Sequence, residues 1–200
     1  MSKTAFHTFF IIGFMLSACV SSLKQEEVPA YLEKHDLMLE KDINSIKYKA
    51  SLVSNEIITR QLIVGASGKD QIDSLKSVYE KYFYFSVEVS KSGTDLLASQ
   101  AGTPQYNEVI RNFEFGIGEK ANLTTDQGDT LQLLDYSFPR TYGLTNSSKI
   151  LFVFEKPDLV KTEYIEFTLG DFGFNTGDVR FRFRTKNIQK FLNKRIVFTD

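Results

Sequence analysis

Alternation between apolar and polar positions is the dominant pattern of the chain beyond residue 36. Residues 82–90 place Phe83, Phe85, Val87 and Val89 on one side of an extended chain and mostly polar side chains on the other. The same period of two runs through residues 37–42 and 45–53, which predicts an opening hairpin. Residues 150–154 are apolar at every position, which predicts a strand inside the sheet system.

The last two predicted strands have a register that the sequence itself selects. With Phe167 opposite Phe181, apolar residues meet on one face and Glu166 meets Arg182 on the other. Because both faces agree, we expect residues 164–169 and 179–184 to pair antiparallel in this register.

Helical spacing is limited to short segments. Residues 54–64 begin with capping residues and end at Gly65, and residues 70–79 repeat apolar positions at helical intervals. A third helix is expected over residues 104–113, and Asp126 to Asp129 predict the turn of a hairpin that joins residues 121–125 to 130–138. The predicted fold class is therefore α+β, predominantly antiparallel β and sandwich-like, with two or three short helices.

The N-terminus has a different character. An apolar run from Ala5 to Met15 follows Lys3 and ends in Leu16-Ser17-Ala18-Cys19, which holds the only cysteine of the chain. A membrane-spanning helix needs about 20 apolar residues, roughly twice the length of this run. The segment therefore indicates a signal peptide.

The four residues Leu16-Ser17-Ala18-Cys19 resemble the lipobox of bacterial lipoprotein precursors at every position. The resemblance implies lipid transfer to the Cys19 thiol, cleavage after Ala18, and recognition by lipoprotein processing enzymes. The expected organisation is a signal peptide over residues 1–18, a lipidated cysteine with a flexible tether over 19–29, and a single β-rich globular domain over 30–200. The expected anchor is a lipid bilayer that holds the acylated Cys19.

The residues that follow Cys19 give information about the membrane to which the protein is delivered. Residue 20 is Val, so the Asp of the familiar inner-membrane retention signal is absent, and an outer-membrane location is favoured. The segment Lys24-Gln25-Glu26-Glu27 resembles the acidic export signals of surface lipoproteins in Bacteroidota, although a solvated linker would have the same composition. The sequence leaves open whether the domain faces the periplasm or the outside.

Three further segments resemble uncharacterised lipoproteins from Bacteroidota. They are residues 47–56, residues 140–144, and the Phe172-Gly173-Phe174 loop with the strand that follows it. Such families carry no established activity, so this resemblance implies an envelope protein and no particular mechanism.

Charge and residue inventory exclude several classes of function. The formal net charge is −1, without the basic excess of a nucleic-acid-binding protein. Once the signal peptide is removed, His35 is the only histidine, and the Cys19 thiol is consumed by the lipid. A Cys–His pair or a multi-histidine zinc site is then impossible within one chain. No complete phosphate-loop or dinucleotide motif occurs, so we expect no cofactor and no bound metal.

One candidate site is a stripe of arginines. Arg180, Arg182 and Arg184 alternate with apolar residues, which places three guanidinium groups on one face of a strand. Such a stripe could bind the phosphates of lipid A, peptidoglycan or an acidic protein partner, because Arg binds phosphate and carboxylate groups in a bidentate manner. The alternative is a solvated face neutralised by Glu166 and its neighbours, which is common on half-exposed strands.

Two other features are candidates for contact or modification. The loop of residues 170–178 is long for a hairpin and carries Phe172 and Phe174, which we expect to form an exposed patch for a partner. Asp129-Thr130-Leu131 and Asp73-Ser74-Leu75 match the short O-glycosylation pattern of Bacteroidota, at Thr130 and Ser74.

Three functions fit this inventory. The first is a non-catalytic binding or structural module anchored at the cell envelope. The second is a carboxylate-dependent hydrolase of glycan or peptidoglycan, which needs paired acids in a cleft. The third is an accessory subunit of a surface or secretion complex, which needs an exposed apolar patch.

Overall fold

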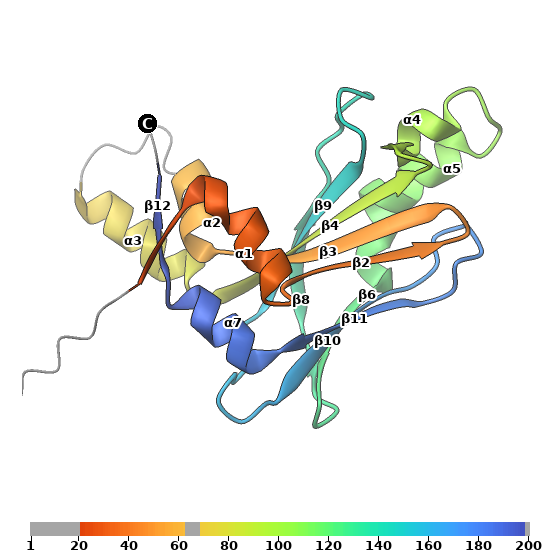
Figure 1. Ribbon diagram of the computed structural model, residues 1–200. Coiled ribbons are helices and arrows are strands. Elements are labelled where there is room, and N and C mark those ends of the chain that lie inside the picture. Colours follow the sequence, from red (N-terminus) through yellow and green to blue (C-terminus); the bar gives the residue numbers. More distant parts are fainter. Residues whose placement is uncertain (1–20, 63–68, 199–200) are drawn as a thin grey trace, which may run out of the picture.

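A six-stranded antiparallel sheet forms the larger layer of the molecule. The computed structural model describes residues 21–62 and 69–198 (Figure 1). The sheet is ordered β2-β3-β4-β9-β8, and its strands are β2 (Met38–Ile43), β3 (Ile46–Val53), β4 (Tyr82–Lys91), β9 (Ser148–Glu155) and β8 (Leu133–Ser137). Asn44 and Ser45 both have positive φ, as a tight turn between β2 and β3 requires. The predicted opening hairpin is therefore confirmed, and so is the interior position of β9. The short strand β5 (Thr94–Asp95) pairs with the end of β4.

A four-stranded antiparallel sheet forms the second layer. Its order is β11-β10-β6-β7, from β11 (Val179–Arg184), β10 (Tyr164–Leu169), β6 (Ala121–Thr125) and β7 (Thr130–Leu131). Phe167 pairs with Phe181 and Glu166 pairs with Arg182. The register predicted from the two faces is confirmed.

Phenylalanine side chains join the two sheets. The ring of Phe85 on β4 lies 5.7 Å from that of Phe167 on β10 and 5.2 Å from that of Phe183 on β11, centroid to centroid. All three side chains are fully buried. Because aromatic rings bury large apolar areas and stabilise further through ring–ring contacts, this cluster is the centre of the core. The predicted α+β class with mostly antiparallel, sandwich-like sheets is confirmed.

The three predicted helices are present, with additional short ones. The predicted set corresponds to α2 (Asn55–Leu62), α3 (Lys69–Tyr79) and α5 (Tyr106–Arg111), which continues as a π-helix over Asn112–Gly116. The described chain also contains α1 (Val28–Lys34), α4 (Leu96–Gln100), α6 (Ile117–Lys120) and α7 (Thr185–Leu192). These helices have four to eight residues, which is too short for an apolar period to stand out.

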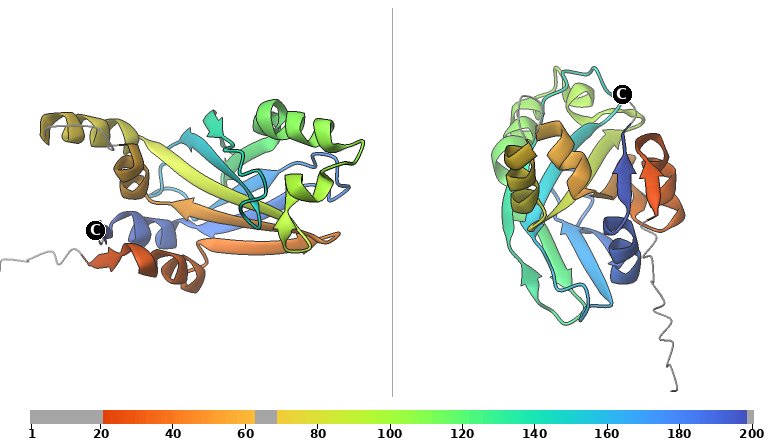
Figure 2. Two further views of the ribbon diagram at one scale, coloured as in Figure 1. Left: turned by 90° about the horizontal axis from the view of Figure 1, so that it is seen from above. Right: turned by 90° about the vertical axis from the view of Figure 1, so that its left-hand side faces the viewer.

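Helices α1 and α7 pack together at one end of the sandwich, and α4 and α5 lie at the opposite end (Figures 1 and 2). The amide of Asn187 on α7 donates to the carbonyl of His35 at the end of α1, over 2.9 Å. The rings of Tyr31 and Phe191 stack between the two helices at 5.8 Å. His35 itself is half-buried against Tyr31 and ends α1.

The segment predicted as a flexible tether is part of the fold. Strand β1 (Ser22–Lys24) pairs parallel with β12 (Arg195–Val197), and a 3-10 helix over Gln25–Glu27 leads into α1. Leu23 and Val28 are buried in the main core. The prediction is therefore wrong for residues 21–29, because the partner strand of β1 lies at the other end of the chain. The predicted signal peptide and the predicted lipidation site Cys19 lie outside the described residues.

The predicted hairpin of residues 121–138 is correct only in its first half. Thr130 and Leu131 pair with β6, but the chain then crosses to the larger sheet, where Leu133–Ser137 form β8 beside β9. Apolar alternation through both segments could not show that the strand changes sheets.

Candidate anion-binding site

The arginine stripe lies on an edge strand. Strand β11 turns Val179, Phe181 and Phe183 into the core, and its three arginines are exposed on the outer face. This is the arrangement that the alternation predicted. The three arginines are accessible because they lie on the exposed face of β11, which is also an edge strand of its sheet.

Two of the three arginines have acidic partners. Arg182 Nη2 lies 3.1 Å from Glu166 Oε2, and its guanidinium stacks 4.3 Å from the centre of the Tyr164 ring. Arg180 Nη2 lies 3.8 Å from Asp178 Oδ2, a solvent-exposed pair of the kind that contributes little stability. The neutralised-face interpretation therefore holds for part of the stripe. Arg184 forms no ion pair with any residue that the structure describes.

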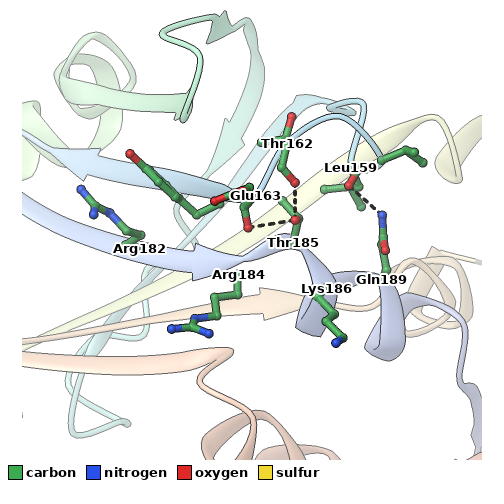
Figure 3. Close-up of a pocket in the computed structure, with 10 residues that line it drawn as sticks. Leu159, Thr162, Glu163, Arg182, Arg184, Thr185, Lys186 and Gln189 are labelled. Carbon is green, nitrogen blue, oxygen red and sulfur yellow. Dashed lines mark hydrogen bonds between the residues drawn. The ribbon is translucent and has the colours of Figure 1, made fainter.

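A hollow of about 720 Å³ opens beside Arg182 and Arg184, between the end of the β10–β11 pair and α7 (Figure 3). The hollow is lined by Leu159, Val160, Thr162, Glu163, Tyr164, Arg182, Arg184, Thr185, Lys186 and Gln189.

Hydrogen bonds hold α7 against the segment that precedes β10. The Thr185 hydroxyl donates to the carbonyls of Thr162 and Glu163, and the Thr185 backbone N–H also donates to Glu163 O, over 3.0 Å. The Gln189 amide donates to Leu159 O over 2.7 Å. These bonds fix the wall of the hollow and the position of Lys186.

The lining is predominantly cationic. The lining includes three cations, Arg182, Arg184 and Lys186, and a single carboxylate, that of Glu163. Lys186, like Arg184, makes no ion pair within the described chain. It also stands in the first turn of α7, where no acidic residue is present and where the helix dipole disfavours a cation. An anion in the hollow would supply the missing negative partner of these cations and would also offset the unfavourable dipole at Lys186. The arrangement is therefore suited to binding a phosphate, sulfate or carboxylate group.

Lys186 was not among the residues predicted from the sequence. A signal for it exists in the composition of residues 179–199, which hold seven Lys and Arg residues and no Asp or Glu. The net charge of the whole chain is close to zero and therefore does not indicate this basic segment.

The loop of residues 170–178 is not a partner surface. Phe172 is 1% exposed, and its ring contacts those of Phe113 at 5.1 Å and Tyr48 at 6.1 Å. Phe174 is half-buried against the same core. The predicted exposed patch at these two residues is therefore wrong, because the loop folds back over the open end of the sandwich.

Asp171 determines the shape of that loop. Its carboxylate accepts the backbone N–H groups of Gly173, Phe174 and Asn175 over 3.0 to 3.2 Å. Burial alone would raise the pKa of Asp171, but the hydrogen bonds outweigh it and lower the pKa below its usual value. Two aromatic residues in a long loop thus indicated core packing rather than contact with a partner.

Exposed apolar side chains occur elsewhere, near α5. Phe115, Tyr142 and Leu144 are all more than 70% exposed. The ion pair between Arg140 and Glu114 joins the segment before Tyr142 to the π-helix that carries Phe115. This is the surface that an accessory-subunit function would use in place of the Phe172 loop.

The hydrolase hypothesis needs two acids in one hollow. Glu114 and Asp135 share a hollow of about 480 Å³ with Phe115, Tyr136 and Phe138. Arg140 Nε donates to the Glu114 carboxylate over 2.6 Å, so this carboxylate is already engaged in an ion pair that joins two segments of the fold. Asp135 is exposed, and its Oδ1 accepts the backbone N–H of Tyr136 over 2.8 Å.

The two residues predicted to be O-glycosylated, Thr130 and Ser74, both lie on the surface. Thr130 is exposed at the start of β7, and Ser74 is exposed on α3. Both are accessible to modification, and their O-glycosylation stays a prediction. Within residues 21–62 and 69–198, no group of three or more His, Cys, Asp or Glu side chains could hold a metal ion.

No protein-family model, curated protein or solved structure matches this chain. Among the helices described, none combines the length and apolar character needed to cross a membrane.

Proposed function

We propose that this chain is a lipid-anchored cell-envelope protein, most consistent with the outer membrane, that works as a non-catalytic module binding an anionic ligand. The lipid is attached at Cys19, and the ligand binds in the hollow beside Arg182, Arg184 and Lys186. Its partners are the bilayer, the lipoprotein processing enzymes and an anionic envelope component.

The anchor rests on the sequence and is compatible with where the fold begins. The lipobox ends at Cys19, and the first strand starts three residues later, at Ser22. Three extended residues span about 10 Å. Acylation at Cys19 would thus hold the domain directly at the membrane surface, without a long linker.

The binding function rests on one observation. Arg184 and Lys186 line the same hollow, and neither has an acidic partner in the described chain. Exposed cations are common, but two without acidic partners that line one hollow, with Arg182 beside them, provide donors of the kind that recognise phosphate or carboxylate groups.

The test is a titration of the protein with inorganic phosphate, followed by NMR of the backbone amides. We expect saturable shifts confined to residues 182–189. Arg184→Ala should raise the dissociation constant about tenfold, because a hydrogen bond to a charged group is lost. Arg180→Ala is the matched control, since Arg180 lies on the same strand face but does not line the hollow. Shifts that are unaffected by Arg184→Ala, or that scatter over all basic residues, would overturn the proposal.

A further inference from the structure

We propose that the anionic ligand is the phosphate of lipid headgroups in the bilayer that anchors Cys19, so that the α7 side of the domain lies on the membrane. The inference rests on the proposed function and names its ligand. The surface concerned, called here the basic strip, consists of Arg184, Lys186, Lys190 and Lys194.

The basic strip begins at the hollow and ends beside the anchor. Helix α7 has eight residues and is about 12 Å long, and it leads from the hollow to β12. Lys194 Nζ donates to the Ser21 hydroxyl over 2.9 Å, only two residues after Cys19. Because β12 pairs with β1, the fold holds Lys194 close to Ser21. A lipid on Cys19 would therefore bring α7 to the headgroup region.

None of the four cations of the basic strip has an acidic partner among the described residues. Lys186 and Lys190 are one helical turn apart on the exposed face of α7, opposite the buried Ile188 and Phe191. Like charges at this spacing repel each other. Their repulsion would be relieved by an anionic surface, where each cation strengthens binding about fivefold.

An apolar residue at the same rim favours a membrane over a soluble anion. Val160 lines the hollow and is 86% exposed. An exposed aliphatic side chain contributes nothing to capture of free phosphate in water. At a bilayer surface, however, it can enter the boundary between headgroups and acyl chains while the cations contact phosphates.

The experiment uses the chain from residue 19 with Cys19→Ser, so that no acyl chain can hold it. Its binding is measured by co-sedimentation with vesicles of phosphatidylcholine and with vesicles that also contain phosphatidylglycerol. We expect binding to the second kind only, weakening as salt is added. Arg184→Ala/Lys186→Ala should reduce the partition coefficient about 25-fold, as two cations are lost.

The control is Lys47→Ala/Lys149→Ala, which removes the same charge from the other sheet. Both lysines are more than half exposed, with only loose ion pairs, at 3.7 and 3.8 Å. This variant should bind anionic vesicles within about twofold of the parent. An equal loss in both double variants would reduce the effect to net charge and overturn the inference. Thermal unfolding of each variant checks that the fold is intact.

Phosphate titration separates this inference from the function on which it rests. If phosphate still shifts the amides of residues 182–189 but the parent ignores anionic vesicles, the binding function stands and the membrane ligand is wrong. If neither probe binds, both proposals fail. Binding to the two kinds of vesicle with equal strength would also overturn the role of the strip.

Discussion

Tyr84 is a buried tyrosine on the outer face of the larger sheet. Its side chain is 3% exposed, and its hydroxyl donates to the Tyr79 carbonyl over a long 3.4 Å. Burial, with smaller contributions from Tyr79 and Tyr82, raises the pKa of Tyr84 to about 12. The folded protein therefore keeps this proton at a pH where the unfolded chain has released it.

The consequence is a loss of stability in alkali. Between pH 10 and 12 the unfolded chain binds fewer protons than the folded one, so the free energy of unfolding falls as the pH rises. Tyr84 should account for up to about 3 kcal/mol of this fall. Urea unfolding of the parent and of Tyr84→Phe at a series of pH values will measure it, because only the parent loses this component. Parallel curves for the two proteins would contradict the pKa assignment.

At the scale of single elements, the local alternation of apolar and polar residues reliably predicts the buried and exposed sides of strands. It does not predict which distant segments of the chain pair with each other. The β10–β11 register follows from residues that both strands carry, and the buried and exposed sides of β3, β4 and β11 follow from alternation. Strand β1 has three residues, of which Leu23 alone is apolar. Nothing nearby indicates a partner for it, since Arg195–Val197 are supplied from the opposite end of the chain.

Leu23 should decide whether the segment after Cys19 is held or free. Leu23→Asp would bury a carboxylate in the core, which is costly without a partner, so β1 should detach from β12. We expect trypsin to cleave after Lys24 at least tenfold faster in this variant, because cleavage follows the population of the open form. Ser22→Asp is the matched control, as Ser22 is exposed on the same strand. Equal cleavage of the variant and the parent would show that β1 contributes little to holding the segment.

At the scale of the whole molecule, the sequence sufficed for the fold class but for only part of the site. Arg182 and Arg184 were found because they alternate with core residues on one strand. The hollow and Lys186 were not found, because the position of α7 depends on bonds from Thr185 to Thr162 and Glu163, about twenty residues earlier in the chain. The crossing from β7 to β8 was missed for a similar reason. Each depends on tertiary contacts that no local pattern contains.

The proposed lipid anchor at Cys19 makes a separate prediction for the whole protein. Replacing Cys19 by Ala removes the acceptor of the lipid, so the precursor should keep its signal peptide and gain no acyl mass. Intact mass spectrometry of the protein extracted from membranes will test this, with Ser17→Ala as a control that leaves the cysteine in place. An unmodified Cys19 in the mature parent protein would exclude the lipoprotein assignment.

The pairing of β1 with β12 also has a consequence for the order of events during export. The strand next to Cys19 is made first, but its partner leaves the ribosome only after nearly all of the described chain. Until then β1 has no strand beside it, so closure of the fold cannot limit access of the processing enzymes to Cys19. Lipidation would therefore precede closure of the fold. Pairing of β12 with β1 would then hold the domain next to its proposed lipid anchor.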